Sequence, residues 1–215
     1  MTTAQSIISR AHTTLQDHDG VRWSAVELVD HLNVGQREIV RLRPDQKATT
    51  TAVTLTSGFR HALPAGALTL IDIPNNRTGR FRRITKVDMV QLDAVMPDWR
   101  SRAAAAEIIH FMHDLREPRV FHTYPPAVNA QVDMVHSVLP TDVPTPTGPM
   151  ASHVSGVIDL SVQWADALLN WVLFKSYAKD AEFGGNSQMA ASYLGLFNAA
   201  IGSQLQSTAT VAPQT

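Results

Sequence analysis

Three histidines and an aspartate in the middle of the chain are residue types that could bind a catalytic metal ion. His110, His113 and Asp114 are followed by His122, and imidazole and carboxylate groups are suitable ligands for zinc or iron. Such a site would indicate a metal-dependent hydrolase or nuclease. However, residues 107–112 read as a β-strand, and a strand directs His110 and His113 to opposite faces. We therefore expect no metal, no cofactor and no catalytic residues, and keep the hydrolase as an alternative.

Five cationic residues within one short segment form a second candidate site. They follow an Asn-Asn pair and surround Gly79, and they are Arg77, Arg80, Arg82, Arg83 and Lys86. Guanidinium groups bind carboxylates of a neighbouring protein or phosphates of DNA. The net charge of −1 gives the whole chain no broad electropositive surface for nucleic acid. We therefore interpret these residues as a candidate subunit or partner interface. The alternatives are a solvated loop and a DNA-binding module that uses the Arg77–Lys86 loop.

The segment from Asp17 to Glu27 predicts a corner between two helices. Ser24 and Glu27 have the spacing of a capping box, in which the Ser hydroxyl accepts from the amide of the third helical residue. Asp17-x-Asp19-Gly20 resembles the opening of a calcium loop, but the later ligands and the glutamate at position twelve are missing. The candidate corner residues are accordingly structural. They are Asp19, Gly20, Trp23, Ser24 and Glu27.

Helical periodicity is clear at both ends of the chain. Apolar residues recur at helical spacing over 3–16 and again from Ser24 to Pro44, where proline ends the pattern. Near the other end, 159–183 has the same character. Gly184-Gly185 then provides a stop and Asn186 a start for a last helix. Residues 203–215 have the composition of a flexible tail.

The middle of the chain has β-strand character. Alternating or β-branched runs predict strands at 48–56, 68–73, 107–112, 119–124 and 131–138, and a short helix is expected from Asp88. Residues 61–66 read as a loop, and Pro74-Asn75-Asn76 as a turn. Four prolines between 139 and 149 predict an extended linker.

These elements predict an α+β protein, most simply a four-helix bundle with an inserted β-rich module. The expected division has a helical hairpin at 1–46, the β-rich insertion at 47–140 and a Pro-rich linker at 141–156. A second helical hairpin at 157–202 and the tail at 203–215 complete it. Charged residues make up 17% of the 215 residues, below the roughly 25% of ordinary soluble domains. A low charge content fits a subunit that buries its flanks against copies of itself.

Two further exclusions follow from composition. The chain has no cysteine, so disulfides, thiolate metal sites and thiol nucleophiles are excluded. No apolar run reaches the roughly 18 to 20 residues of a membrane span, and we expect neither membrane insertion nor secretion.

Four short motifs occur in a recognisable order. They are Asp17-His18-Asp19-Gly20-Val21-Arg22-Trp23, Arg41-Leu42-Arg43-Pro44-Asp45, Tyr124-Pro125-Pro126 and Lys179-Asp180-Ala181-Glu182. Their order and spacing over residues 3–202 resemble the head-to-tail adaptor proteins of short-tailed, double-stranded DNA phages, which are relatives of the tail tubular A proteins. The Pro-Thr segment at 140–149 departs from that pattern.

The resemblance implies a structural virion protein rather than an enzyme. Its copies would form a ring of twelve that docks under the portal protein, presents a platform to the tail nozzle and contacts tail fibres. Genomic DNA would pass through the ring without sequence-specific binding. The resemblance also implies a position at the head-tail junction of the virion, assembly in the host cytoplasm, and a flexible C-terminal segment that becomes ordered on the portal.

Overall fold

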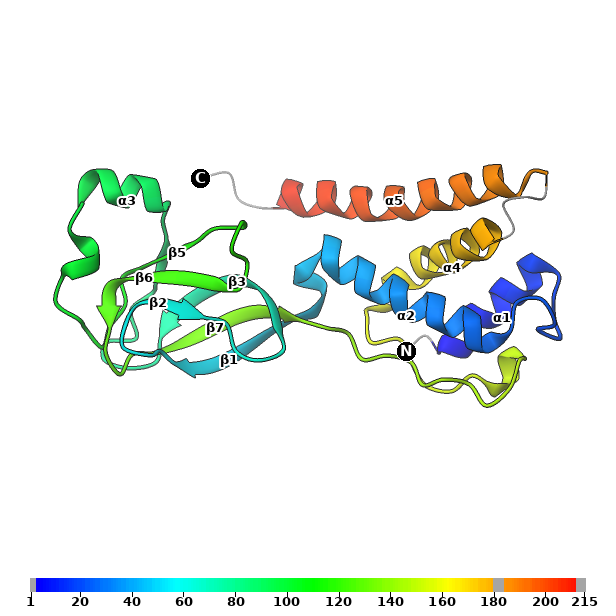
Figure 1. Ribbon diagram of the computed structural model, residues 1–215, viewed down its shortest axis with the longest axis horizontal. Coiled ribbons are helices and arrows are strands. Elements are labelled where there is room, and N and C mark those ends of the chain that lie inside the picture. Colours follow the sequence, from blue (N-terminus) through cyan, green and yellow to red (C-terminus); the bar gives the residue numbers. More distant parts are fainter. Residues whose placement is uncertain (1–2, 180–183, 212–215) are drawn as a thin grey trace. The chain divides into compact units, whose positions relative to one another are not determined.

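The computed structural model describes residues 3–179 and 184–211, with side chains described up to Gly202. The described part is a mixed α+β structure with five α-helices and two sheets. It divides into two compact units (Figure 1). One unit is helical and combines residues 1–43 with 140–215, and the other is β-rich and comprises residues 44–139. The β-rich unit is therefore an insertion in the sequence of the helical one.

The helical unit is organised around one central helix. Its helices are α1 (Ala4–Leu15), α2 (Ala25–Leu42), α4 (Ala165–Lys179) and α5 (Asn186–Val211). Helix α4 packs against α1, α2 and α5, as Figure 1 shows. Its apolar residues are buried around most of its circumference, whereas α1 and α2 each bury a single stripe. Fully buried side chains in this core include Ile7, Ile8, Leu28, Leu32, Ile39 and Trp164.

Both N-terminal helices are capped by a side chain, and the cap of the second is the predicted Ser24. The Thr3 hydroxyl accepts from the Ser6 amide at 3.2 Å and caps α1. The Ser24 hydroxyl accepts from the Glu27 amide at 3.4 Å and caps α2. Pro44 then opens a 3-10 turn at Pro44–Lys47, because proline cannot continue the helical hydrogen bonding. The predictions of both helices are confirmed.

The β-rich unit contains two sheets that share one apolar core. The first has the antiparallel order β1 (Ala48–Thr54), β7 (Gln131–Val138), β3 (Ala67–Asn76). The second has the order β2 (Gly58–Ala62), β6 (Val120–Ala127), β5 (His110–His113), β4 (Thr85–Lys86), and only β4 and β5 are parallel. A short helix, α3 (Met89–Val95), follows β4. The core includes Leu70, Ile73, Val132 and Met134 from the first sheet and Phe111 and Phe121 from the second.

Two predictions for the β-rich segment were wrong. Residues 58–62 form β2, which pairs with β6. The sequence analysis predicts no element for residues 58–60 and a loop from residue 61. Residues Pro74–Asn76 are the end of β3, not a turn. The turn residues there are overridden by tertiary hydrogen bonds, because the Asn76 side chain is fully buried and bonded across the unit.

The C-terminal elements also differ from expectation. Helix α4 starts at Ala165, after a 3-10 turn at Val162–Trp164, and not at Asp159. The expected continuation over 180–183 lies outside the described residues. Helix α5 runs to Val211, through nine residues of the stretch that composition assigns to a flexible tail. No helix of the described residues is long and apolar enough to span a membrane.

The Pro-rich segment is irregular, as predicted, but it is bound to the helices. Val143 is buried, and its backbone exchanges hydrogen bonds with the Asn33 side chain of α2. The Gln36 side chain of α2 accepts from the Asp159 amide at 2.8 Å. The Pro149 carbonyl accepts from the Ala25 amide at 2.6 Å. Residues 140–160 therefore form part of the helical unit and not a free connection.

Candidate functional site

The predicted cationic residues lie on a hairpin that follows β3. The Ile84 amide donates to the Pro74 carbonyl at 2.9 Å, and the Asn76 amide donates to the Arg82 carbonyl at 3.1 Å. The chain thus reverses over residues 77–81 and returns beside β3. We call residues 76–84 the cationic hairpin. Lys86 lies just beyond it, in β4.

Asn76 holds the base of the hairpin in place through its side chain. Its side-chain amide donates to the carbonyls of Arg82 at 2.9 Å and Ile108 at 2.8 Å, and its side-chain oxygen accepts from the Ile108 amide at 2.8 Å. Three hydrogen bonds satisfy a polar side chain that has no exposed surface. The base of the hairpin is therefore held against the segment that leads into β5.

The cationic side chains of the hairpin differ in their partners. Arg77 forms an ion pair with Asp133 of β7 at 3.0 Å. The Arg80 backbone amide is held by the Glu107 carboxylate, but the Arg80 side chain is exposed. Within residues 3–179 and 184–202, no ion pair involves the side chains of Arg80, Arg82, Arg83 or Lys86, and all four residues are exposed. Four of the five cations are thus available to an external partner.

The tip of the hairpin carries an aromatic residue that the sequence analysis did not single out. Phe81 is 71% exposed and has φ of 54°. A positive φ is uncommon for a bulky residue. Gly79 has φ of 69°, and a Cβ there would collide with the Glu107 side chain. The backbone of the tip therefore presents a phenyl ring to solvent between Arg80 and Arg82.

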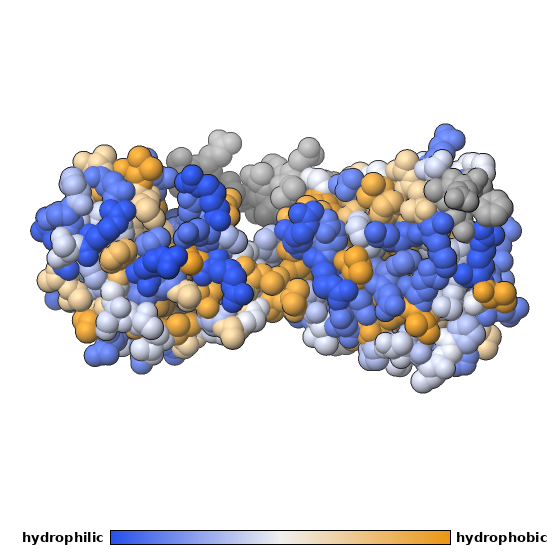
Figure 2. All heavy atoms as spheres, viewed as in Figure 1, coloured by the Kyte–Doolittle hydropathy of each residue, from blue (hydrophilic) through white to orange (hydrophobic). Residues whose placement is uncertain are grey.

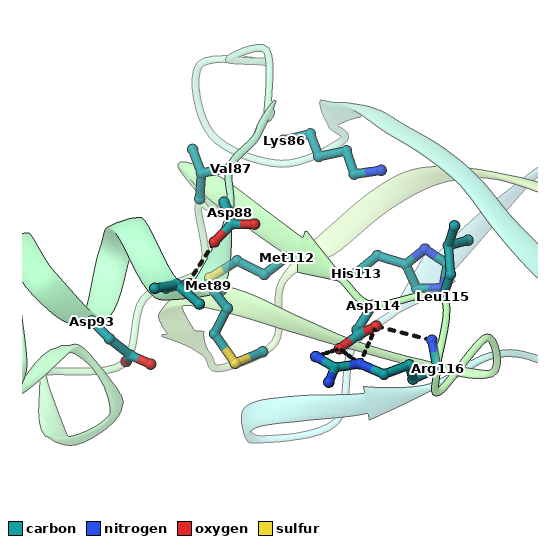
Figure 3. Close-up of a pocket in the computed structure, with 11 residues that line it drawn as sticks. Lys86, Val87, Asp88, Met89, Asp93, Met112, His113, Asp114, Leu115 and Arg116 are labelled. Carbon is teal, nitrogen blue, oxygen red and sulfur yellow. Dashed lines mark hydrogen bonds and ion pairs between the residues drawn. The ribbon is translucent and has the colours of Figure 1, made fainter.

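A cavity of about 640 Å³ lies elsewhere in the β-rich unit, between α3, the segment before it, the end of β5 and the turn after β5 (Figure 3). Its apolar lining consists of Val87, Met89, Val90, Met112 and Leu115. Its charged lining consists of Lys86, Asp88, Asp93, Asp114 and Arg116, and His113 completes it. Leu115 is 80% exposed at the cavity. The cavity thus combines apolar walls with three carboxylates and two cations.

The carboxylates of the cavity are held in place by hydrogen bonds. Asp88 caps α3 by accepting from the Val90 amide at 2.7 Å. Asp93 accepts from Arg100 at 2.6 Å, and this hydrogen bond, aided by one from Trp99, lowers the pKa of the Asp93 carboxyl. Asp114 pairs with Arg116 at 2.6 Å, and the hydrogen bond from Arg116 likewise lowers the pKa of Asp114.

The histidines proposed as metal ligands do not converge. His110 stacks on Tyr124 with ring centroids 6.1 Å apart, whereas His113 donates to the Pro118 carbonyl at 3.2 Å. His122 stacks on Phe59 at 6.0 Å. Across the described chain, no three histidine, aspartate or glutamate side chains form a group that could hold a metal ion. The geometry gives the hydrolase alternative no support.

One histidine outside the predicted set has a distinct environment. His61 is buried between the Thr123 hydroxyl at 3.0 Å and the Thr56 hydroxyl at 3.3 Å. Burial, together with the proximity of His122, lowers the pKa of His61 to about 4. The ring is therefore neutral at neutral pH. It serves as a hydrogen-bonded element of the core.

The helical corner is a structural junction and not a calcium loop. The Asp17 carboxylate accepts from the backbone amides of Val21, Arg22 and Trp23 at 3.0, 2.8 and 2.8 Å. Burial opposes ionisation of Asp17, but these three hydrogen bonds outweigh it and lower its pKa. Asp19, the residue that the sequence analysis preferred, is exposed. The sequence does contain a signal for Asp17, because an aspartate at a turn commonly accepts hydrogen bonds from backbone amides of the residues that follow it.

The remaining corner residues connect α1 and α2 to α4 and to the Pro-rich segment. Gly20 has φ of 65° and packs against the Pro149 carbonyl. The Trp23 indole donates to the Ser176 carbonyl of α4 at 3.4 Å. Glu27 pairs with Lys179 at the end of α4 at 2.8 Å. These contacts fix the packing of three helices.

Helix α5 offers a different kind of surface. Its 26 residues include no Asp, Glu, Lys or Arg. Ala190, Phe197 and Ile201 are buried, whereas Met189 and Leu196 remain exposed. Figure 2 shows apolar and weakly polar residues with a few hydrophilic ones along the described part of α5, whereas the surface of α2 is mostly hydrophilic. The outer face of α5 is thus unusually poor in charge for a surface helix.

The fold is that of a two-unit α+β protein, and its distinctive exposed features are the cationic hairpin, the cavity beside α3 and the charge-free helix α5. The family model described as SU10 adaptor protein matches residues 2–215. The chain therefore belongs to the SU10 adaptor protein family, and it is a bacteriophage adaptor, a structural component of the virion. No curated protein matches it in sequence.

Proposed function

We propose that this adaptor is the subunit of a ring that joins the portal to the tail nozzle in a short-tailed phage, as tail tubular A-like connectors do. The observation that carries the proposal is the family match over residues 2–215. The order of the four sequence motifs supports the finer assignment. The adaptor family itself is structural and not enzymatic.

In this proposal the helical unit acts as a four-helix bundle that packs beside its copies around the channel. Its halves are the hairpins at 1–46 and 157–202, and the β-rich insertion at 47–140 contacts the tail nozzle. The charge-free helix α5 supports this role, because burying its outer face against protein would desolvate no charged group. Twelve copies and contacts to tail fibres complete the proposed assembly.

The proposed position is the head-tail junction of the virion, reached by assembly in the host cytoplasm. Genomic DNA passes through the channel during ejection without sequence-specific binding. The net charge of −1 supports a channel that does not grip DNA, since proteins that coat DNA carry a clear basic excess.

Mass photometry of the protein mixed with purified portal rings of the same phage tests the proposal. We expect a discrete mass increase that corresponds to one adaptor per portal subunit. A variant that lacks residues 203–215 tests the docking role of the C-terminal segment, and loss of the mass increase would assign docking to it. No association of either form with the portal would contradict the proposed function.

A further inference from the structure

The β-rich unit has two surface features to which no role has been assigned, the tip of the cationic hairpin and the cavity beside α3. We propose that they are the two halves of one contact between copies of this chain: the Phe81 ring of one copy enters the cavity of the next, and the surrounding arginines meet its carboxylates. The inference rests on the proposed ring function and adds to the packing of the helical units a second contact between neighbouring copies, within the β-rich unit.

The hairpin tip has the composition of an interface anchor. Aromatic residues and arginines are enriched among the residues that dominate protein–protein binding, whereas lysines are depleted from interfaces. Phe81 is flanked by Arg80, Arg82 and Arg83, and these three side chains are exposed without an ion pair in the described structure. Phe81 itself is exposed and does not line the cavity of its own copy. Its ring is therefore available to a second molecule.

The cavity matches an aromatic ring in size and chemistry. Its volume of about 640 Å³ exceeds that of a phenyl side chain. Met89 and Met112 contribute flexible thioethers, which adapt to ring shapes and make favourable sulfur–aromatic contacts. Leu115 is largely exposed at the cavity and would be covered by the incoming hairpin.

The charges at the cavity favour an incoming guanidinium. Of the three aspartates that line the cavity, Asp93 is paired with Arg100 and Asp114 with Arg116, which leaves Asp88 outside these ion pairs. Asp93 already accepts from Trp99 and Arg100, and Asp114 already accepts from the backbone amide and the guanidinium of Arg116. Asp88 is exposed and its Oδ1 alone accepts from the Val90 and Gln91 amides, so its Oδ2 can accept a charge-assisted hydrogen bond from an incoming arginine.

The geometry of such a contact determines the kind of assembly. The donor surface and the acceptor surface are different patches of the same unit, so the contact is heterologous. Heterologous contacts link copies head to tail and produce a ring when the rotation closes. Because both patches belong to the β-rich unit, the contact involves that unit alone.

Disulfide trapping tests the contact directly, because the natural chain has no cysteine. Two single variants, Arg82→Cys and Leu115→Cys, are mixed under mild oxidation. The mixture is tested at high protein concentration in solution and, separately, on portal rings. A disulfide forms only where the two Cα atoms come within about 7 Å of each other. The proposed contact places the hairpin tip of one copy at the cavity of the next, so we expect a disulfide-linked dimer of the two different variants. The matched control replaces Leu115→Cys with Val95→Cys, a position of equal exposure on α3 that does not line the cavity.

A second substitution distinguishes specific contact from random collision. Phe81→Ala, added to Arg82→Cys, removes the anchor and leaves the cysteine in place. We expect the yield of the Arg82→Cys/Leu115→Cys dimer to fall to the level of the Val95→Cys control. A dimer yield that is independent of Phe81, or equal in the control, would overturn the contact.

The remaining outcomes separate this inference from the proposed function. If copies assemble on portal rings but Arg82→Cys and Leu115→Cys are not linked there, this contact is wrong and the ring function stands. If the two cysteines are linked but no copies bind the portal, the contact stands and the portal-docking function is wrong. If no link forms and the protein binds duplex DNA with a steep salt dependence that Arg80→Gln/Arg82→Gln/Arg83→Gln abolishes, the hairpin is a phosphate-binding element instead.

Discussion

The Asn33 side chain and the Val143 backbone, 110 positions apart in the chain, exchange two hydrogen bonds. Asn33 Oδ1 accepts from the Val143 amide at 2.8 Å, and Asn33 Nδ2 donates to the Val143 carbonyl at 3.0 Å. Both residues are buried. One asparagine of α2 thus replaces the backbone pairing that a Pro-rich segment cannot provide for itself.

Substitution of Asn33 by alanine is therefore expected to destabilise the helical unit. The change leaves the buried amide and carbonyl of Val143 unpaired, which costs about 2–4 kcal/mol in the free energy of unfolding. Urea unfolding monitored by circular dichroism measures the loss. Asn198→Ala on the exposed face of α5 is the control and should change stability by less than about 0.5 kcal/mol. Equal stabilities of the two variants would contradict the anchoring role.

Asn76 offers the same test in the β-rich unit. Asn76→Ala removes two buried hydrogen bonds and one partly buried hydrogen bond, and is expected to cost about 2–4 kcal/mol. The neighbouring Asn75 is exposed, so Asn75→Ala is a matched control that should be nearly neutral. Hydrogen exchange gives a local readout, because the Ile84 amide, bonded to Pro74, should exchange faster in Asn76→Ala only.

These two asparagines illustrate which parts of the fold could be predicted. Local signals were reliable: Ser24 begins α2 through its own hydroxyl, and the alternation over 131–138 matches β7. The turn predicted at Pro74–Asn76 failed because its outcome depends on Ile108, a residue 32 positions away. The fixed position of the Pro-rich segment likewise depends on Asn33. Sequence patterns report local preference and not which distant partner satisfies a polar group.

In the candidate site, too, local features could be predicted from the sequence and long-range contacts could not. The cluster of cations was visible in the sequence, but the pairing of Arg77 with Asp133 and the exposure of the others were not. Phe81 carries no local signal, because an isolated aromatic residue is most often buried. The cavity is formed by segments on both sides of residues 96–111, so no contiguous motif could indicate it.

Gly20 is expected to tolerate no side chain. Its positive φ disfavours any other residue, and a Cβ would collide with the Pro149 carbonyl. Gly20→Ala should therefore reduce the free energy of unfolding by about 2 kcal/mol or more. Gly195→Ala in α5 is the contrasting control: a Cβ there meets no neighbouring atom, and the helix should gain up to about 1 kcal/mol. Opposite signs in the same urea unfolding experiment are the expected result, and a stable Gly20→Ala would exclude the close approach to Pro149.

His61 predicts a specific dependence of stability on pH. Its pKa of about 4 in the folded protein lies below the ordinary value of 6.5, so the unfolded chain binds a proton first as the pH falls. The contribution of the neutral ring to stability is complete above pH 6.5 and is lost as the pH falls towards 4, by about 2–3 kcal/mol. His61→Gln should unfold with a weaker pH dependence in this interval, although it is less stable at pH 7. His18→Gln, at an exposed position, should retain the dependence of the natural chain. Urea unfolding at a series of pH values from 7 to 4 measures the three curves, and parallel curves for all three proteins would show that His61 does not carry the effect.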